Sequence, residues 1–545
     1  MKFCPECGAK LVSQKFCAEC GEDLRKYTGQ GGEGAGGLDS FDFSALEREA
    51  KNQLLEQSGM QIEGSVLVKY TGKSRDVVIP KGVTEIYAEA FKNNQTIASV
   101  VIPDGVTSIG KGAFANCKYL QTVQIPSTVV EIYESAFQDC QELQDIKLPS
   151  GLASIRDHVF YGCYALKHVE IPRGVTGIGS YAFASCRSLA QISLPQTLTR
   201  IGQKAFSGCL ALTDITLPTG VTAIDRETFS GCEALTSLVL PEGLVSIEYY
   251  AFGRCKALAT LTIPDSLRKI DVNAFDGCGN LQNFYITDLT AWCRISGLYG
   301  LLGSDRPKNL YVNGKRITDL NIPQSVTQIQ RRTFAYFPQF TRITVPNSVV
   351  AIDFEAFIGC DNLTEITLPF IGRCPSAQSE YDQVFGYIFG YQESSGKGLG
   401  EATLQHFAGS RWQGGHYYYF IPRTLRKVTI TGGTLVPYRA FWNCDYLTSI
   451  TLPASTVHIG ANAFWKCTGL TGLDIPEGVE TIGIAAFGDC TALRSLTIPR
   501  SVTTIQEYAF GGCDALTVRV PSGKQYDPAA FDYPFDKKRV NVVTY

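Results

Sequence analysis

Four cysteines near the N-terminus are spaced so that they could bind a metal ion. Cys4-x-x-Cys7 and, nine residues later, Cys17-x-x-Cys20 supply two pairs of thiolates. Two such pairs bring four sulfurs to one tetrahedral Zn²⁺ at about 2.3 Å. Because a four-thiolate site leaves no open coordination position, the metal would hold the segment together and perform no chemistry. We therefore predict a small zinc ribbon over residues 1–25, with one structural Zn²⁺.

The charge of this segment bears on whether it could contact nucleic acid. Up to Lys26 it contains five basic and four acidic residues, and four thiolates with one Zn²⁺ add about −2, so the net charge is about −1. Affinity for nucleic acid depends on basic side chains that neutralise phosphates. A nucleic-acid-associated protein that binds through its zinc ribbon is therefore an alternative and not the leading interpretation.

A second set of cysteines recurs every 23 residues, once in nearly every copy of a repeat. In a stack of β-strands neighbouring thiols would lie about 5 Å apart, which a disulfide could bridge. Asn94 and Phe337 take the same position in two copies, which a metal or redox column would not tolerate. Because free cysteine behaves as a small buried hydrophobe, we predict inert packing. The set is Cys117, Cys140, Cys163, Cys186, Cys209, Cys232, Cys255, Cys278, Cys360, Cys444, Cys467, Cys490 and Cys513.

Catalytic constellations are missing from the sequence. The five histidines occupy unrelated repeat positions, apart from two that share the segment 370–426. We find no nucleophile and base at a suggestive spacing, no glycine-rich phosphate loop and no carboxylate pair that stands apart from the repeat. We therefore predict that the protein is not an enzyme.

Aromatic residues are the best candidates for contact with a partner, because aromatic side chains concentrate binding energy at interfaces. Segment 370–426 is rich in glycine and aromatic residues, and one further tyrosine takes an outward strand position of the repeat. Alternatively, the same rings could pack on the stack. The predicted partner-binding residues are Tyr387, Tyr391, Trp412, Tyr418 and Tyr285.

A repeat must position all of these residues. Phenylalanine returns every 23 residues from Phe91 to Phe275, then at Phe334, Phe357 and in four further copies from Phe441 to Phe510, which makes fifteen copies. A fixed period of 20–50 residues means that no unit can bury its own apolar face, so each stacks on the next in a solenoid.

One copy shows how a turn of the solenoid is built. Ile192 and Leu194 alternate with Ser193 as in a strand, with the first two pointing inward. Pro195 ends the strand because proline has no amide hydrogen for the ladder. Phe206 is the largest core group of the turn. We predict a mostly β fold in which each strand pairs in parallel with its equivalent 23 residues later.

The repeat blocks and their interruptions divide the chain. The predicted parts are the zinc ribbon at 1–25, a glycine-rich linker at 26–37, a helix at 38–59 as candidate N-terminal cap, repeats at 60–286, an insertion at 287–320, repeats at 321–369, an aromatic and glycine-rich insertion at 370–426, repeats at 427–521 and a C-terminal cap at 522–545. Within these parts we expect a hairpin around residues 70–73, a short helix at 290–295 and a hairpin at Asn313-Gly314.

The unit I-P-x-x-V-x-x-I-G-x-x-A-F-x-x-C-x-x-L resembles the BspA-type class of bacterial leucine-rich repeats, over roughly residues 76–521. The resemblance implies a right-handed leucine-rich-repeat stack with a parallel sheet. It also implies a role in binding or adhesion, often at the cell surface, and it brings no catalytic residues.

Charge and hydropathy complete the prediction. With 49 basic and 52 acidic residues the formal charge is −3, so the positive field that attracts phosphate backbones or anionic lipids is lacking. We see neither an export signal nor an apolar stretch long enough to span a membrane. We predict a cytoplasmic, non-enzymatic scaffold that binds a protein partner of unknown identity; the alternative is a cell-surface adhesin.

Overall fold

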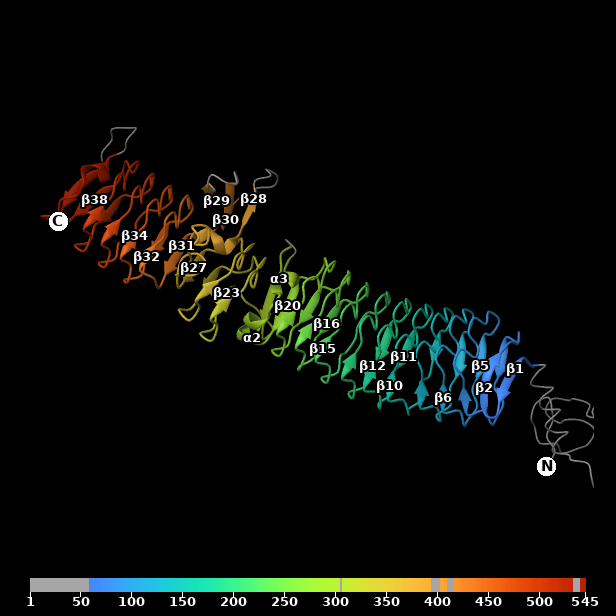
Figure 1. Cartoon of the computed structure of the whole chain (residues 1–545). Helices are drawn as coiled ribbons and strands as arrows, with labels where there is room; N and C mark the ends of the chain where they lie inside the picture. Colours follow the sequence, from blue (N-terminus) through green and yellow to red (C-terminus); the bar gives the residue numbers. More distant parts are fainter. Residues whose placement is uncertain (1–57, 304–305, 394–401, 409–415, 533–539) are drawn as a thin grey trace, which may run out of the picture. The chain divides into compact units, whose positions relative to one another are not determined.

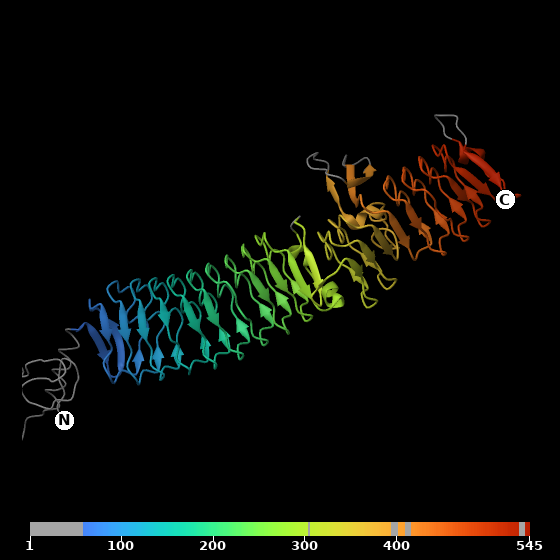
Figure 2. The same cartoon turned by 180° about the vertical axis from the view of Figure 1, so that it is seen from behind.

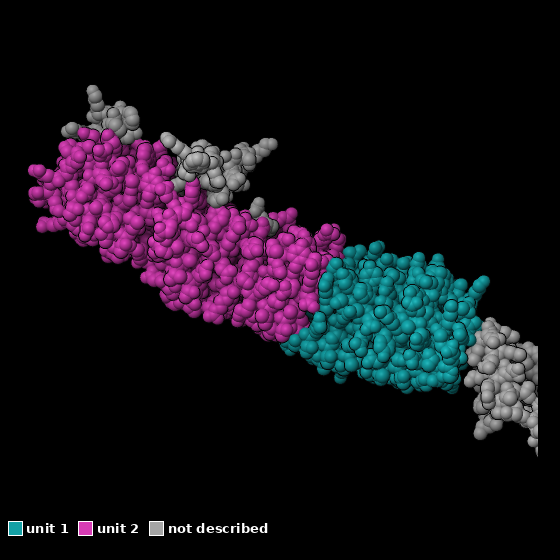
Figure 3. Space-filling model, viewed as in Figure 1, with its two compact units in different colours: residues 1–220 teal, residues 221–545 magenta. Residues whose placement is uncertain are grey.

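The computed structural model describes residues 58–303, 306–393, 402–408, 416–532 and 540–545, and the side chains within 391–418 are not described. The described chain is a mostly β, parallel solenoid of about 19 turns. It forms two compact units, residues 1–220 and 221–545 (Figure 3). The predicted mostly β parallel fold is confirmed.

Unit 1 consists of two kinds of short ladder, one for each straight segment of the turn, and both are parallel apart from the antiparallel pair β1 and β2 (Figure 1). Equivalent residues pair at the predicted spacing, as His168 with Gln191 shows. The first ladder contains β3 (Asp76–Val78), β5 (Ser99–Val101), β7 (Thr122–Gln124), β9 (Asp145–Ile146), β11 (His168–Glu170) and β13 (Gln191–Ser193). The second kind contains β1 (Met60–Glu63), β2 (Val66–Tyr70), β4 (Glu85–Ile86), β6 (Ser108–Ile109) and β8 (Glu131–Ile132), and separately β10 (Ser154–Ile155), β12 (Gly177–Ile178) and β14 (Arg200–Ile201).

The repeated proline turns the chain from the first segment to the second. Its carbonyl accepts a hydrogen bond from the amide three residues later, for example at 3.0 Å from Val175 to Pro172 and 3.1 Å from Leu198 to Pro195. Proline thus ends one ladder and closes a tight turn that leads into the next.

A third backbone ladder runs through the turn that contains the phenylalanine. The amide of Phe91 donates to the carbonyl of Ala113 at 2.7 Å, and the amide of Phe114 donates to Ala136 at 2.8 Å. The wide turn needs left-handed backbone on either side of the ring, as at Gly112 (φ 59°) and Asn116 (φ 61°) around Phe114. Successive turns are therefore held together along three sides.

The core of unit 1 is a column of stacked rings. Phe91, Phe114, Phe137 and the three equivalent rings that follow are fully buried. Centroids of consecutive rings lie 4.7–5.7 Å apart with interplanar angles of 2–19°. Since the strand spacing sets this distance, one ring in each turn fills the interior without gaps.

Unit 2 has the same architecture, with ring columns at 5.1–5.9 Å. Its strands are β15 (Ala223–Ile224), β16 (Ser237–Val239), β17 (Ser246–Ile247), β18 (Thr260–Thr262), β19 (Lys269–Ile270), β20 (Asn283–Ile286), β21 (Asn309–Val312), β22 (Lys315–Arg316), β23 (Asp319–Asn321), β24 (Gln328–Ile329), β25 (Arg342–Thr344), β26 (Ala351–Ile352) and β27 (Glu365–Leu368). They continue with β28 (Tyr391–Glu393), β29 (Ala402–Ala408), β30 (His416–Pro422), β31 (Lys427–Ile430), β32 (Leu435–Val436), β33 (Ser449–Thr451), β34 (His458–Ile459), β35 (Thr481–Ile482), β36 (Ser495–Thr497), β37 (Thr504–Ile505), β38 (Thr517–Val520) and β39 (Asn541–Thr544).

The first insertion is a longer turn of the solenoid. Strand β21 pairs in parallel with β20 over four residues, although 26 residues separate the partners. The intervening α2 (Leu289–Arg294), capped by Asp288, and α3 (Leu298–Leu301) bury Trp292, whose indole N–H donates to the carbonyl of Thr333 at 3.0 Å. The expected helix and the Asn313-Gly314 hairpin between β21 and β22 are both confirmed.

The second insertion also keeps the stack continuous. Strand β27 pairs directly with β31. The 3-10 helix η2 (Phe385–Phe389), which lies between these two strands in the sequence, is buried in the core. The ring of Phe385 lies 5.2 Å from that of Phe441, and its amide donates to Ala440 as a core phenylalanine does. Strands β28, β30 and β29 form an antiparallel sheet that projects from the ladder (Figures 1 and 2).

Two features of the ends differ from or add to the sequence prediction. The expected hairpin at residues 70–73 is wrong, because the antiparallel turn joins β1 to β2 at Gly64 and Ser65. Tyr70 instead packs against Phe91 at the start of the column, with ring centroids 5.0 Å apart and tilted by 37°. At the C-terminal end, Phe531 in η3 (Pro528–Phe531) stacks on Phe510, and β39 pairs with β38. The solenoid has more than fifteen turns because such segments supply a turn without the consensus phenylalanine.

The ring column makes a direct prediction about stability. Replacing Phe137 by alanine should cost about 3–5 kcal/mol, because it opens a cavity between two rings that stack on it at 5.2 and 5.7 Å. Urea denaturation followed by circular dichroism measures the loss. As a control, Tyr87→Ala, at a ring 52% exposed, should change stability by about 0.5 kcal/mol or less. Equal losses for the two variants would refute the ring column as the main core element.

Candidate binding surfaces

The predicted zinc ligands Cys4, Cys7, Cys17 and Cys20 lie outside the described residues. Within the described residues, no group of three or more histidine, cysteine or acidic side chains is arranged to hold a metal ion. Structural zinc in the N-terminal segment stays a prediction.

The recurring thiols line the core of both units, next to the ring column. Most of these thiols donate a hydrogen bond to a phenylalanine carbonyl of the preceding turn, as from Cys117 to Phe91 at 3.0 Å and from Cys140 to Phe114 at 3.2 Å, whereas Cys444 donates to Trp442 at 3.9 Å. All fifteen cysteines of the described residues are free. The carbonyls of Phe91 and Phe114 also accept from the backbone amides of Asn94 and Cys117. The column therefore combines a small apolar group with a weak second donor for a buried carbonyl.

Burial suppresses the chemistry of these thiols. Desolvation raises the pKa of Cys117 to about 12, and it raises the pKa of Cys140, Cys163 and Cys186 well above the ordinary value. Because the thiolate is the reactive form, such thiols are poor nucleophiles and poor metal ligands at neutral pH.

Tyr285 lies on the solvent face of the sheet in unit 2, as its outward position in the predicted strand indicates. It pairs in register with Tyr311 of β21, and the two half-exposed rings stack with centroids 4.5 Å apart at 10°. On the other side of Tyr285, Thr262 and then Val239, which is 65% exposed, continue the same row. We call this row, Val239, Thr262, Tyr285 and Tyr311, the tyrosine platform.

A row of amides runs beside the tyrosine platform on the same face. Asn309 donates to the side-chain oxygen of Asn283 at 3.0 Å and accepts from Arg316 at 3.0 Å. Arg316 lies directly across from Tyr311 in the neighbouring strand. The hydrogen bonds fix the orientation of these polar groups, so the rings are flanked by preorganised donors and acceptors.

The remaining predicted partner-binding residues lie in the second insertion. Tyr387 belongs to η2 and is 9% exposed, with its ring 5.5 Å from that of Phe354, and burial raises its pKa to about 12. Tyr391 lies in β28 and Tyr418 in β30, where Tyr418 pairs with Gln392, while Trp412 lies outside the described residues. The structure thus brings Tyr387, Tyr391 and Tyr418 into one insertion and leaves Tyr285 on a separate surface.

Tyr311 is a candidate binding residue that the repeat period does not predict. It stands 26 residues after Tyr285, so counting in steps of 23 passes over it. The alternating N-L-Y-V segment before Asn313-Gly314, which matches N-F-Y-I at 283–286, is the signal that the sequence does contain.

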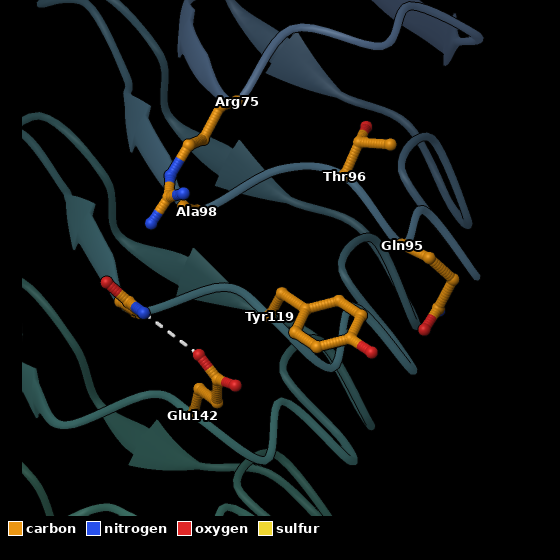
Figure 4. Close-up of a pocket in the computed structure, with 7 residues that line it drawn as sticks. Arg75, Gln95, Thr96, Ala98, Tyr119 and Glu142 are labelled. Carbon is orange, nitrogen blue, oxygen red and sulfur yellow. Dashed lines mark hydrogen bonds between the residues drawn. The ribbon is translucent and has the colours of Figure 1, made fainter.

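A polar hollow of about 420 Å³ in unit 1 is likewise absent from the sequence prediction (Figure 4). Its lining includes Arg75, Ala98, Tyr119, Gln121 and Glu142, which come from four consecutive turns. Tyr119 is 51% exposed, and Gln121 donates to Glu142 at 2.9 Å. The residues lie just before the strands of the first ladder, at positions where the consensus unit sets no residue type.

Comparisons with known proteins agree with this architecture. The model of the BspA type leucine rich repeat region matches residues 64–190, 176–292, 306–377 and 416–534, which is more than half of the chain. No curated protein matches.

Solved structures with a similar fold come from several bacteria. A leucine-rich repeat protein from Bacteroides ovatus is 24% identical over 86% of this chain and 96% of its own, with a TM-score of 0.33. A leucine rich cell surface protein from Faecalibacterium prausnitzii is 21% identical over 89% of this chain and 94% of its own, with a TM-score of 0.29. A T. pallidum leucine rich repeat protein is 25% identical over 41% of this chain and 88% of its own, with a TM-score of 0.25.

None of the helices in the described part of the chain has the length and hydrophobicity to cross a bilayer.

The thiol column makes the fold sensitive to alkali. A buried thiol with a raised pKa stays protonated in the folded state, whereas the same thiol ionises near pH 9 in the unfolded state. Its contribution to the free energy of unfolding is therefore fully present below pH 9. For Cys117 the contribution should fall as pH rises from about 9 to about 12, by up to about 1.4 kcal/mol per pH unit. Thermal unfolding between pH 7 and 11 measures it. Cys117→Ala should flatten the decline, whereas Cys374→Ala, at a half-exposed thiol, should leave it unchanged; an equally steep decline in Cys117→Ala would refute the assignment.

Proposed function

Since the chain belongs to the family of BspA-type leucine-rich repeat proteins, we propose that it is a non-enzymatic scaffold that binds a protein partner through the tyrosine platform. The observation that carries the proposal is the stacked pair of Tyr285 and Tyr311 on the solvent face of the sheet. Two rings fixed against each other lose little conformational entropy on binding, and tyrosine and arginine are the residues that dominate protein interfaces.

Charge favours protein over nucleic acid as the partner. The chain has a formal charge of −3, and near the tyrosine platform one guanidinium, that of Arg316, is engaged with Asn309. Lys315 and Arg316 are the two basic residues of the neighbouring strand β22. Stacking rings with so small a basic patch in a chain of net negative charge suit a protein surface better than a phosphate backbone.

We further propose a cytoplasmic location. The support is the thiol column, in which thiols of adjacent turns are reduced and donate to carbonyls. Compartments with a thiol-reducing pool preserve such a column, whereas oxidising compartments favour disulfides between close cysteines.

Photo-crosslinking inside cells that make the protein tests both proposals. A benzophenone amino acid placed at Thr262, beside the tyrosine pair, should capture a protein, and the double variant Tyr285→Ala/Tyr311→Ala should reduce capture at least about tenfold. A matched control places Tyr299→Ala in the same unit, where an exposed tyrosine of α3 lies outside the platform, and capture should persist. Capture that survives the double variant would rule out the platform, and labelling of the protein on intact cells by a membrane-impermeant reagent would rule out the cytoplasmic location.

We also propose that Cys4, Cys7, Cys17 and Cys20 bind one structural Zn²⁺. The support is the paired C-x-x-C spacing. Elemental analysis of the purified full chain should give about one zinc per chain. Cys4→Ser/Cys7→Ser should lose it, and Cys374→Ser, at a cysteine outside the motif, should keep it. Full zinc content in the double variant would refute the assignment.

A further inference from the structure

The polar hollow of unit 1 is a site separate from the tyrosine platform, and its chemistry identifies a class of ligand. We propose that it binds a neutral saccharide.

The hollow lies where a small residue stands between two long side chains at equivalent positions of adjacent turns. Arg75, Ala98 and Gln121 precede strands β3, β5 and β7 and are equivalent residues of three successive turns. Ala98 presents only a methyl group where its neighbours carry a guanidinium and an amide. Figure 4 shows the side chain of Arg75 reaching past Ala98, with Tyr119 and Glu142 in the turns beyond. The volume of about 420 Å³ falls within the range of about 300–1,000 Å³ typical of small-molecule sites.

Apart from Arg75, the hydrogen-bonding side chains around the hollow offer several acceptors. Gln121 uses its amide N–H to reach Glu142 Oε2, which leaves Gln121 Oε1 and Glu142 Oε1 to accept. Gln95 donates to the carbonyls of Asn93 and Asn116, and its oxygen faces no donor among the described residues. The ligand must therefore bring several donors into a small volume.

Thr96 adds a further acceptor and Arg75 supplies the complementary donors. Thr96 donates its hydroxyl hydrogen to Asn94 at 2.9 Å, so its lone pairs remain for a ligand. Within the described residues the guanidinium of Arg75 has no hydrogen-bond or ion-pair partner, so five N–H groups are available to accepting oxygens. Closely spaced hydroxyl groups donate and accept at once, which is the pattern that this lining requires.

The balance of charge selects a neutral ligand. Arg75 and Glu142 line the hollow together, so an anion would meet the carboxylate and a cation would meet the guanidinium. The exposed ring of Tyr119 offers an apolar face on which the C–H face of a sugar ring can pack. An extended peptide supplies one donor and one acceptor about every 3.3 Å, which is too sparse for four acceptors in one hollow.

Saturation-transfer NMR and calorimetry with the full chain test the proposal. The probes are maltotriose, cellotriose, triacetylchitotriose and mannotriose, then a printed array of neutral glycans, with trigalacturonate and trilysine as charged comparisons. At least one neutral saccharide should bind. Tyr119→Ala and Ala98→Gln, which fills the hollow, should each weaken binding at least about tenfold.

Two further variants serve as controls, one for the position of the site and one for the charge of its ligand. Ala190→Gln makes the same change at the equivalent residue of a later turn in unit 1, and binding should stay within about twofold. Glu142→Gln keeps an accepting oxygen without the charge, so it should weaken binding of a neutral saccharide by less than Tyr119→Ala does. Should every neutral glycan fail to bind, should a charged probe bind more tightly, or should Tyr119→Ala bind as well as the unchanged chain, the proposal is overturned.

Discussion

The whole structure depends on one contact that recurs between consecutive turns. A phenylalanine ring stacks on the ring of the next turn while its own carbonyl receives the thiol hydrogen of a cysteine 26 residues later, as Phe114 does from Cys140. The stacking removes apolar surface from water, and the thiol gives a buried carbonyl a second donor besides the backbone amide three residues later. Since each turn is completed only by its neighbour, no turn is stable alone, and stability arises along the column.

This dependence explains how the chain accepts insertions of very different length. A segment can be added wherever the ladder resumes in register and some ring fills the core position. Phe385 does this within the second insertion, and Trp292 fills the interior beside Phe284 and Phe337 within the first. Loop closure costs only about 0.6 kcal/mol for each doubling of loop length, so long segments between paired strands are tolerated. The structural demand falls on one or two residues, and the rest of the insertion is free to vary.

The sequence revealed those parts that the repeating contact dictates. The strands, the proline turns, the buried phenylalanine and the packing role of cysteines such as Cys117 all follow from the period, and the structure confirms them. It could not reveal where Tyr311 would lie, because that depends on β21 resuming the ladder 26 residues after β20. The hollow beside Tyr119 could not be predicted for a similar reason. It depends on the small side chain of Ala98 standing between longer side chains of adjacent turns, and a single repeat does not show that arrangement.

The distinction between residues that the repeat constrains and residues that it leaves free also separates structural from candidate functional positions in this protein. Residues that point inward, such as Val100 and Ile192, are constrained in every turn, whereas Arg75, Tyr119, Tyr285 and their equivalents point outward and carry no structural demand beyond strand propensity. Both proposed binding sites lie where a few outward residues in adjacent turns differ from the average. In unit 2 the difference is two aromatic residues in register, and in unit 1 it is one residue that is too small. Because neither change touches the ring column, either site can be altered or lost while the fold persists.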